Sequence, residues 1–492
     1  MLDPAGLLDA LRRLRHARSS GRAEALLRIA FAVVLLVQLL WLRQNIAFFY
    51  STDSPRPPSP GIALYYTPAV VWACYYLWLA AAALLLVGLF TRVAAVACCL
   101  GCFYFLVQRQ PAATHAADWL IPGMAFHVAL LPSNRFFALD RHFFPRSSTR
   151  DSVPAWPLRL AQLSLAFFYF TAGTSKLGDS VWWHGKGFFM TFANPVLSHL
   201  NLTWLATLPF VSAGLNYLVI LWECTMPVLL LWRRTRLFAV LSAVVFLLAI
   251  DFDLPIGWFS WFCIANLFAF ADDLDWPPAL IVRWPWLSAP AIKASENEKP
   301  AHGTWKQHAV SAFLVFHLAS FAWMQLAYGF FAKGRYDIGM RLAMAPVLGT
   351  YGYGIANVRF YALWPGALFY RLHLVYLEVT PRGGTATALP PFDDRGHARI
   401  GWLASREVRE DVMLMRGLSD NGWRRYFERI GQRYANESGK CPDQIQAYAI
   451  AVGPGTFDTD LRREKALLRT ARFECSSATL QTSLVREAAS SR

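Results

Sequence analysis

Long apolar runs dominate the first two thirds of this chain of 492 residues. About 20 mainly apolar residues in a helix cross a hydrocarbon core of roughly 30 Å, where the helix satisfies its own backbone hydrogen bonds. The sequence predicts nine such helices, at residues 25–48, 69–90, 93–107, 116–131, 158–176, 215–232, 237–250, 256–271 and 308–331. Several runs are short or contain a polar residue, so eight spans fit nearly as well as nine. The pattern predicts a polytopic α-helical membrane bundle in a lipid bilayer.

A different pattern follows the last apolar run. Apolar and polar positions alternate at residues 369–379, 446–452 and 466–473, which is typical of strands. The polar segment 406–434 contains several aromatic residues and predicts one or two amphipathic helices. We therefore expect the tail to form a soluble α+β or β-sandwich domain.

The composition agrees with a membrane protein, and the basic residues indicate which loops face the cytoplasm. Only 16% of the residues are charged and 55% are hydrophobic, whereas about 25% charged residues is usual in soluble domains. Basic residues gather at 12–22, 135–150, 233–236 and in the linker after residue 276. All four stretches fall on one side if the spans alternate, and basic loops favour the cytoplasm. The net charge of +15 is explained by this pattern near anionic lipid rather than by nucleic-acid binding.

These patterns divide the chain into five segments. They are a cytoplasmic N-terminal segment 1–24, a transmembrane domain 25–276, a cytoplasmic linker 277–307, a last transmembrane helix 308–332 and a soluble domain 333–492. An odd number of spans places the soluble domain outside, on the periplasmic or lumenal side. The first apolar run is too long and begins too late for a secretory signal peptide.

The cysteines follow the same division. Six of the eight lie in apolar spans, where a thiol behaves as a small hydrophobic group. The group Cys98, Cys99 and Cys102 has no histidine or carboxylate nearby in the sequence, so core packing is favoured over a metal site. Cys441 and Cys475 lie in the tail, where an oxidising compartment favours a disulfide. Two unpaired thiols are the alternative.

Candidate chemistry concentrates in the segment 165–187, LAFFYFTAGTSKLGDSVWWHGKG. Helical spacing places Gln162, Leu165, Tyr169, Ala172 and Gly173 on the face of Lys176. Small residues let another helix approach, and the tyrosine and glutamine need hydrogen-bond partners. This face is therefore expected to turn into the bundle. Two interpretations of the lysine fit its place near the end of a span: it extends to the headgroups, or it lines a cavity as a functional group.

The run YFTAGTSKLGDSVWWHGKG resembles the signature of the horizontally transferred transmembrane domain (HTTM) family, in which A-G-x-x-K-L is followed by W and G. This family shares its membrane portion with vitamin K-dependent gamma-carboxylase. The stretches THAADWLIPGMAFHVALLPSNRFFALD and LWECTMPVLLLWRRTRLFAVLSAVVFLLAIDFDLPIGWFSWF are similar to the neighbouring helices of the family. The resemblance covers residues 25–276, and the long tail follows the carboxylase layout in general order.

The resemblance implies that Lys176 is a catalytic base of a carboxylase-like lyase. The lysine would deprotonate reduced vitamin K or another lipid-soluble quinol, whose reaction with oxygen gives a base that removes a proton from a glutamate of a peptide or protein substrate before carbon dioxide adds. Burial among apolar helices favours the neutral amine that such chemistry needs. The sequence departs from the carboxylase at 114–118, which reads THAAD instead of Trp-Asn-Asn-His, and at 246–248, which reads FLL where the family commonly has Phe-His-Leu.

Four more residues are candidates for a ligand pocket around Lys176, together with Tyr169 and Gln162. Glu223 lies in a predicted span and either pairs with a buried cation or makes a structural hydrogen bond. His115 and Asp118 begin the fourth span and either share the cavity or face water. His184 lies in a tryptophan-rich loop that either covers an amphipathic ligand or anchors the chain at the interface.

Other polar residues in or beside the spans have simpler explanations. His127 and His317 lie among apolar neighbours and are expected to be core histidines with satisfied hydrogen bonds. Asp251 and Asp253 lie in a short turn, where exposure to water would explain them.

Two functions are compatible with the sequence. The first is a membrane enzyme in which a quinol enters from the bilayer and Lys176 acts as the base. The second is a non-catalytic component of membrane transport, export or immunity, in which Lys176 is half of a structural ion pair. An open pocket with an apolar wall beside Lys176 favours the enzyme, whereas a close pair with Glu223 favours the structural role.

Overall fold

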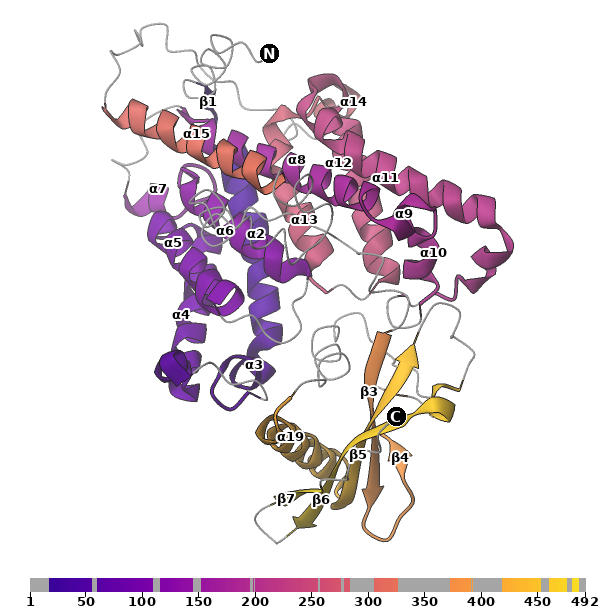
Figure 1. The fold of residues 1–492 in the computed structure, drawn as a ribbon. Coiled ribbons are helices and arrows are strands. Elements are labelled where there is room, and N and C mark those ends of the chain that lie inside the picture. The colour runs from indigo at the N-terminus through magenta and orange to yellow at the C-terminus, as the bar shows by residue number, and fades with distance from the viewer. Residues whose placement is uncertain are drawn as a thin grey trace, which may run out of the picture.

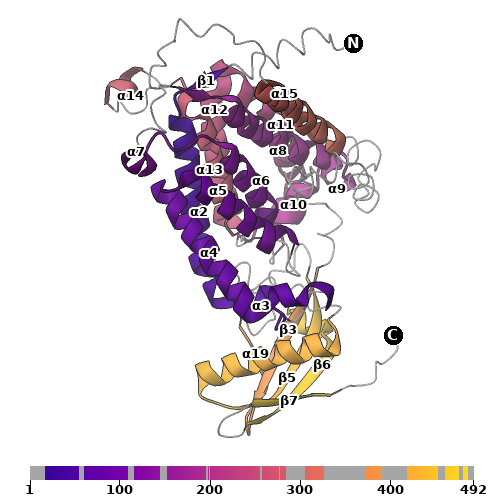
Figure 2. The same ribbon diagram turned by 90° about the vertical axis from the view of Figure 1, so that its left-hand side faces the viewer.

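The protein consists of a helical bundle and a smaller β-sheet unit beside one end of it (Figures 1 and 2). The computed structural model describes residues 17–54, 60–108, 116–144, 152–194, 198, 200–254, 257–275, 278–283, 305–325, 372–390, 392, 418–452, 460–475 and 480–485. Each of the nine predicted apolar runs overlaps a helix. Residue 256 and residues 326–331 of these runs lie outside the described residues.

The long helices follow the apolar runs closely, because the bounds are set where polar residues, glycine or proline interrupt them. They are α2 (Arg22–Leu42) with its continuation α3 (Ile46–Tyr50), α4 (Pro68–Val87), α5 (Thr91–Cys102), α6 (Ala116–Leu130), α8 (Trp156–Leu177), α11 (Pro209–Leu231), α12 (Arg233–Asp253), α13 (Phe259–Leu267) and α15 (Trp305–Gln325). Short elements connect them, namely β1 (Arg18–Ser19), α7 (Asp140–Phe143), β2 (Val153–Pro154), α9 (Ser180–Trp183), α10 (Gly187–Phe192) and α14 (Pro278–Arg283).

Among the described residues, four helical segments are long and apolar enough to cross a membrane, as in a multi-pass membrane protein. These segments are Arg22–Tyr50, Pro68–Val87, Pro209–Leu231 and Arg233–Asp253. In the described part of the chain, Thr91–Leu106, Leu120–Leu130 and His308–Ser320 are apolar but shorter. The expected total of eight or nine spans therefore stays a prediction. Helix α8 is long but carries buried polar side chains, which suit it to the bundle interior.

Helix α2 is the most buried of these four segments and packs against α4, α6 and α13. Half of its apolar window is buried inside the protein, against 28% for both α11 and α12. The outward faces of α11 and α12 carry exposed Leu221, Val228 and Val245. Apolar side chains on such a surface are stable in lipid rather than in water. These two helices therefore present their outer faces to the bilayer.

The tail forms an antiparallel sheet with the strand order β4-β3-β5-β6-β7. The strands are β3 (Leu372–Pro381), β4 (Thr387–Ala388), β5 (Pro442–Val452), β6 (Ala466–Cys475) and β7 (Leu480–Val485), and helix α19 (Asp420–Ser438) packs on the sheet. Trp423, Tyr426 and Phe427 of α19 bury against Ile445 and Ala471. The predicted strands and helix are confirmed except at 369–371 and 406–417, which lie outside the described residues. One sheet covered by a helix is an α+β arrangement.

Helix α19 fixes the sheet unit to the end of the first span. Arg425 donates hydrogen bonds to the carbonyl oxygens of Thr52 and Ser54. The guanidinium of Arg429 lies 3.5 Å from the ring centre of Phe48, where stacking on an aromatic face is favourable. The tail therefore contacts the residues that end the first span.

The predicted disulfide is compatible with the sheet register. Gln444 pairs with Arg472 and Ala447 pairs with Arg469 in the antiparallel ladder between β5 and β6. The same register, continued past Gln444, places Cys441 opposite Cys475. The side chain of Cys475 lies outside the described residues, so the disulfide stays a prediction.

Candidate functional site

The site begins with a close contact between α8 and α11. A Cβ atom on Gly173 would lie 2.7 Å from Sγ of Cys224 and 2.8 Å from its backbone nitrogen, so only glycine fits between the two backbones. All the residues predicted to share the face of Lys176 are buried. The prediction that this face turns into the bundle is confirmed.

Lys176 and Glu223 form a buried ion pair across this contact. Nζ of Lys176 lies 2.6 Å from Oε2 of Glu223, and it also donates to the carbonyl oxygen of Ala172 at 3.3 Å. The ring centre of Trp182 lies 5.2 Å from the same nitrogen. The two charged side chains are only 2% and 7% exposed. The ammonium is therefore held by the helices and does not extend to the headgroups.

The contact brings the nitrogen of Lys176 and the carboxyl group of Glu223 within hydrogen-bond distance. A carboxylate at hydrogen-bond distance stabilises an ammonium, and the attraction is strengthened by the low dielectric of the bundle. An ammonium donates a proton but cannot accept one. In the ion-paired form, Lys176 could act as a base only after its proton had moved to Glu223 or to another acceptor.

Tyr169 and Gln162 share the buried face with Lys176 but differ in their partners. The ring of Tyr169 packs edge-on against Trp222 at 5.4 Å, and its buried hydroxyl has no hydrogen-bond partner among the described residues. Gln162 instead donates to Ala269 and to Asp273, both at 2.7 Å. Because it precedes Lys176 by 14 residues, it lies about 21 Å away along the helix. Of these two candidates, only Tyr169 is placed in the half of α8 that holds the ion pair.

The loop after Lys176 packs one tryptophan inward and leaves the other exposed. Asp179 accepts hydrogen bonds from the backbone of Val181 and Trp182 and starts α9. Trp182 is buried over Lys176, whereas Trp183 is exposed. His184 is exposed, with Nδ1 2.6 Å from the carbonyl oxygen of Ser180. The structure does not bring His184 to the ion pair.

Asn216 ties this loop to α11, although it was not among the residues predicted for the site. Asn216 is fully buried, donates to the carbonyl oxygen of Trp182 at 2.8 Å and accepts from the backbone of Phe188 at 3.1 Å. An amide in an otherwise apolar run was the available sign of such a role. His115 lies outside the described residues, and the side chain of Asp118 is not described, so their place in the site stays a prediction.

A second cluster of charged side chains, only partly buried, lies at the start of α8, and no sequence pattern indicated it. Asp273 accepts from Arg159 at 2.6 Å and from Gln162 at 2.7 Å, and Arg236 lies 3.9 Å away. We call these four residues the Asp273 cluster. Beside it, Asp272 pairs with Arg22 at 2.6 Å. The cluster joins α8, α12 and the 3-10 helix Phe268–Asp273 that follows α13.

Charged residues in α2 are buried near the same end of the bundle. Glu24 is completely buried and accepts from the hydroxyl of Ser19 at 3.0 Å. Arg28 is also completely buried and donates to the carbonyl oxygen of Phe137 at 2.6 Å. Their burial shows that α2 begins inside the protein rather than at its surface.

Two expectations about other polar residues have different outcomes. Asp253 is buried and accepts from the hydroxyl of Ser198 and from the backbone of Leu200, each at 2.8 Å. The expectation that exposure explains Asp253 is therefore wrong, because a distant loop covers it. His127 is buried in the core as expected, with Nδ1 2.6 Å from the carbonyl oxygen of Gly123, and its ring contacts that of His317. Its Nε2 has no hydrogen-bond partner among the described residues, so the expectation of satisfied hydrogen bonds is met only in part.

Possible metal ligands are scattered rather than grouped. Among the described residues, no three histidine, cysteine, aspartate or glutamate side chains lie closely enough together to hold a metal ion. Cys98 and Cys102 are buried free thiols in the core beside α4 and α6.

The helical bundle, its lipid-compatible surface and its buried ion pair define a multi-pass membrane protein with a polar centre. A family model of the HTTM domain matches residues 22–276, slightly more than half of the chain. The chain therefore belongs to the HTTM family, within the carboxylase-like superfamily of membrane proteins. No curated protein and no solved structure matches it.

Proposed function

We propose that this protein is a non-catalytic component of membrane transport, export or immunity, and that Lys176 and Glu223 form its central structural ion pair. The observation that supports this role is the 2.6 Å contact between two side chains that are 2% and 7% exposed. Such a lysine presents almost no surface to a ligand. Its nitrogen is already engaged by the carboxyl group of Glu223 and the carbonyl oxygen of Ala172.

The energetic argument favours a structural role. Removing one partner of a buried ion pair leaves an uncompensated charge and costs about 3–5 kcal/mol, whereas replacing both by apolar residues is often neutral. The pair joins α8 to α11 where Gly173 lets the two backbones meet. The pair therefore fixes the position of α8 relative to α11.

A carboxylase-like enzyme is the second candidate, and one observation favours it. The hydroxyl of Tyr169 is buried without a hydrogen-bond partner among the described residues. A ligand oxygen would satisfy this hydroxyl. In this function a quinol such as reduced vitamin K enters from the bilayer, the proton of Lys176 passes to Glu223, and the free amine deprotonates the quinol.

Two single variants and their combination separate the candidates. Lys176→Met and Glu223→Leu should each lower the free energy of unfolding by about 3–5 kcal/mol, and the double variant should recover most of the loss. The measurement is thermal unfolding of the purified full chain in detergent. Oxidation of reduced vitamin K by each variant is followed in parallel. A Lys176→Met protein that is as stable as the wild type but loses quinol oxidation would reject the structural role and support the enzyme.

We also propose that the N-terminus is cytoplasmic and the tail lies outside. The basic segments support the first part, and the contact of α19 with Thr52 and Phe48 supports the second, since the first span separates these residues from the N-terminus. A cysteine introduced at exposed Gly383 should react with an impermeant maleimide on intact cells. Labelling only after the membrane is permeabilised would contradict this orientation.

A further inference from the structure

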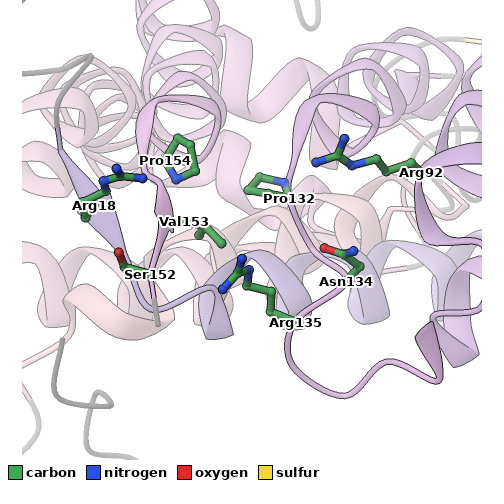
Figure 3. A pocket seen from close by; sticks show the side chains of 8 residues that line it. All are labelled: Arg18, Arg92, Pro132, Asn134, Arg135, Ser152, Val153 and Pro154. Atoms are coloured by element: carbon green, nitrogen blue, oxygen red, sulfur yellow. The ribbon is translucent and has the colours of Figure 1, made fainter. Parts of the chain in front are cut away.

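A pocket of about 400 Å³ opens between β1, β2, the loop after α6 and the start of α5. Arginines enter it from three separate elements: Arg18 from β1, Arg92 from α5 and Arg135 from the loop. In Figure 3, Arg18 and Arg92 extend toward each other from opposite sides, and Arg135 extends from below. Asn134 and Ser152 add polar groups to the wall. The pocket is thus lined by donors from four segments of the chain.

The described lining of the pocket is basic. Its eight residues include three arginines and no carboxylate. Asp140, near the start of α5, is engaged by the backbone nitrogens of Phe90 and Thr91 at 2.6 and 2.8 Å. Guanidinium groups bind phosphate oxygens through paired hydrogen bonds, and several of them around one hollow match a phosphate better than a single carboxylate.

An apolar surface continues from the pocket along α5. Val93, Val96 and Leu100 are all exposed and follow Arg92 at helical spacing, so they form one stripe. The stripe would be stable against acyl chains. A phosphate in the pocket with acyl chains along this stripe has the arrangement of a phospholipid at the end of a span. Basic pockets between membrane helices bind anionic headgroups in this way.

We infer that this pocket is a phosphate-binding site and that its ligand is the headgroup of an anionic phospholipid. The three arginines contact the phosphate, and the α5 stripe lies against the lipid tails. The site is separate from the Lys176–Glu223 pair, so its test does not depend on the proposed function.

The test uses the delipidated full chain in detergent, with dioleoylphosphatidylglycerol and inorganic phosphate as separate probes. Native mass spectrometry measures bound lipid, and thermal unfolding measures stabilisation by either probe. Arg92→Gln removes an exposed guanidinium from the pocket. Arg234→Gln is the matched control, because Arg234 is also exposed but does not line the pocket. Arg18→Gln is a second pocket variant if Arg92→Gln does not fold.

The expected result is that the wild type retains phosphatidylglycerol and that Arg92→Gln weakens its binding by about tenfold, since a hydrogen bond to a charged group is lost. Arg234→Gln should bind as the wild type does. Stabilisation by inorganic phosphate alone, with the same dependence on Arg92, would keep the phosphate site but assign it to a free phosphate. Equal lipid binding by both variants, or no binding of either probe, would overturn the inference.

Discussion

The two ends of α8 hold charged side chains in different ways. Near its start, Asp273 is shared by Arg159 and Gln162, with Arg236 nearby, and the Arg159–Asp273 side chains remain 36% and 21% exposed. Near its end, Lys176 has one carboxylate partner and the pair is almost completely buried. One helix therefore carries a distributed, partly hydrated network and an isolated dry pair.

The difference predicts which substitutions in the bundle are tolerated. In a network, the loss of one group leaves the remaining charges with other partners and with water. In an isolated dry pair, the same loss leaves a charge with no compensation, which is the costly case. Substitutions near Lys176 should therefore have larger effects than equivalent substitutions in the Asp273 cluster.

The largest effect expected from a change outside the charged groups themselves is at Gly173. A methyl group there would lie 2.7–2.8 Å from the Sγ and backbone nitrogen of Cys224, so Gly173→Ala should push α8 from α11 and lengthen the ion pair. Overpacking of this kind costs about 1–3 kcal/mol. We expect Gly173→Ala to reach the upper end of this range, because it also weakens the Lys176–Glu223 pair. The free energy of unfolding in detergent measures it.

Gly214 provides the matched control for this prediction. It lies in α11, and a methyl group placed on it would meet no other atom within 4 Å. Gly214→Ala should therefore be neutral or stabilise the helix by up to about 1 kcal/mol. Equal losses in the two variants would mean that the close approach at Gly173 does not hold the pair together.

Local patterns predicted much of this fold. The nine apolar runs became helices, and the alternating runs of the tail became strands, because hydropathy and periodicity are properties of neighbouring residues. The buried face of α8 and the pairing of Glu223 with a cation could also be predicted from local sequence. A charge inside a span needs a partner of opposite charge, and the predicted spans contain few such residues.

The parts that sequence analysis missed depend on contacts between distant segments. Asp273 meets Arg159 across 114 residues, and Asp253 meets Ser198 across 55. Periodicity gives the face on which a residue lies but does not say which helix lies opposite. Gln162 was assigned to the pocket of Lys176 by its face alone. The rise of about 1.5 Å per residue already placed it at the other end of α8.

The smaller effect is expected at Asp273 itself. Asp273→Asn keeps a side-chain oxygen that accepts from Gln162, but it removes the charge that pairs with Arg159. We expect a loss of about 1–2 kcal/mol, the range for weakening hydrogen bonds to a charged group. Thermal unfolding in the same detergent allows direct comparison with Glu223→Leu.

Asp275→Asn is the control for Asp273→Asn, because it makes the same chemical change two residues away. The Arg233 partner of Asp275 donates hydrogen bonds that lower the pKa of this carboxyl, but the side chains are 76% and 55% exposed. A lowered pKa gives stability that is present above the unfolded pKa and is lost only as the pH falls through the folded one. At pH 7 water and salt screen this pair, so the variant should unfold at the same temperature as the wild type. If Asp273→Asn proved as costly as Glu223→Leu while Asp275→Asn stayed neutral, sharing of charge would not protect the cluster. The contrast between the two ends of α8 would then lie in burial alone.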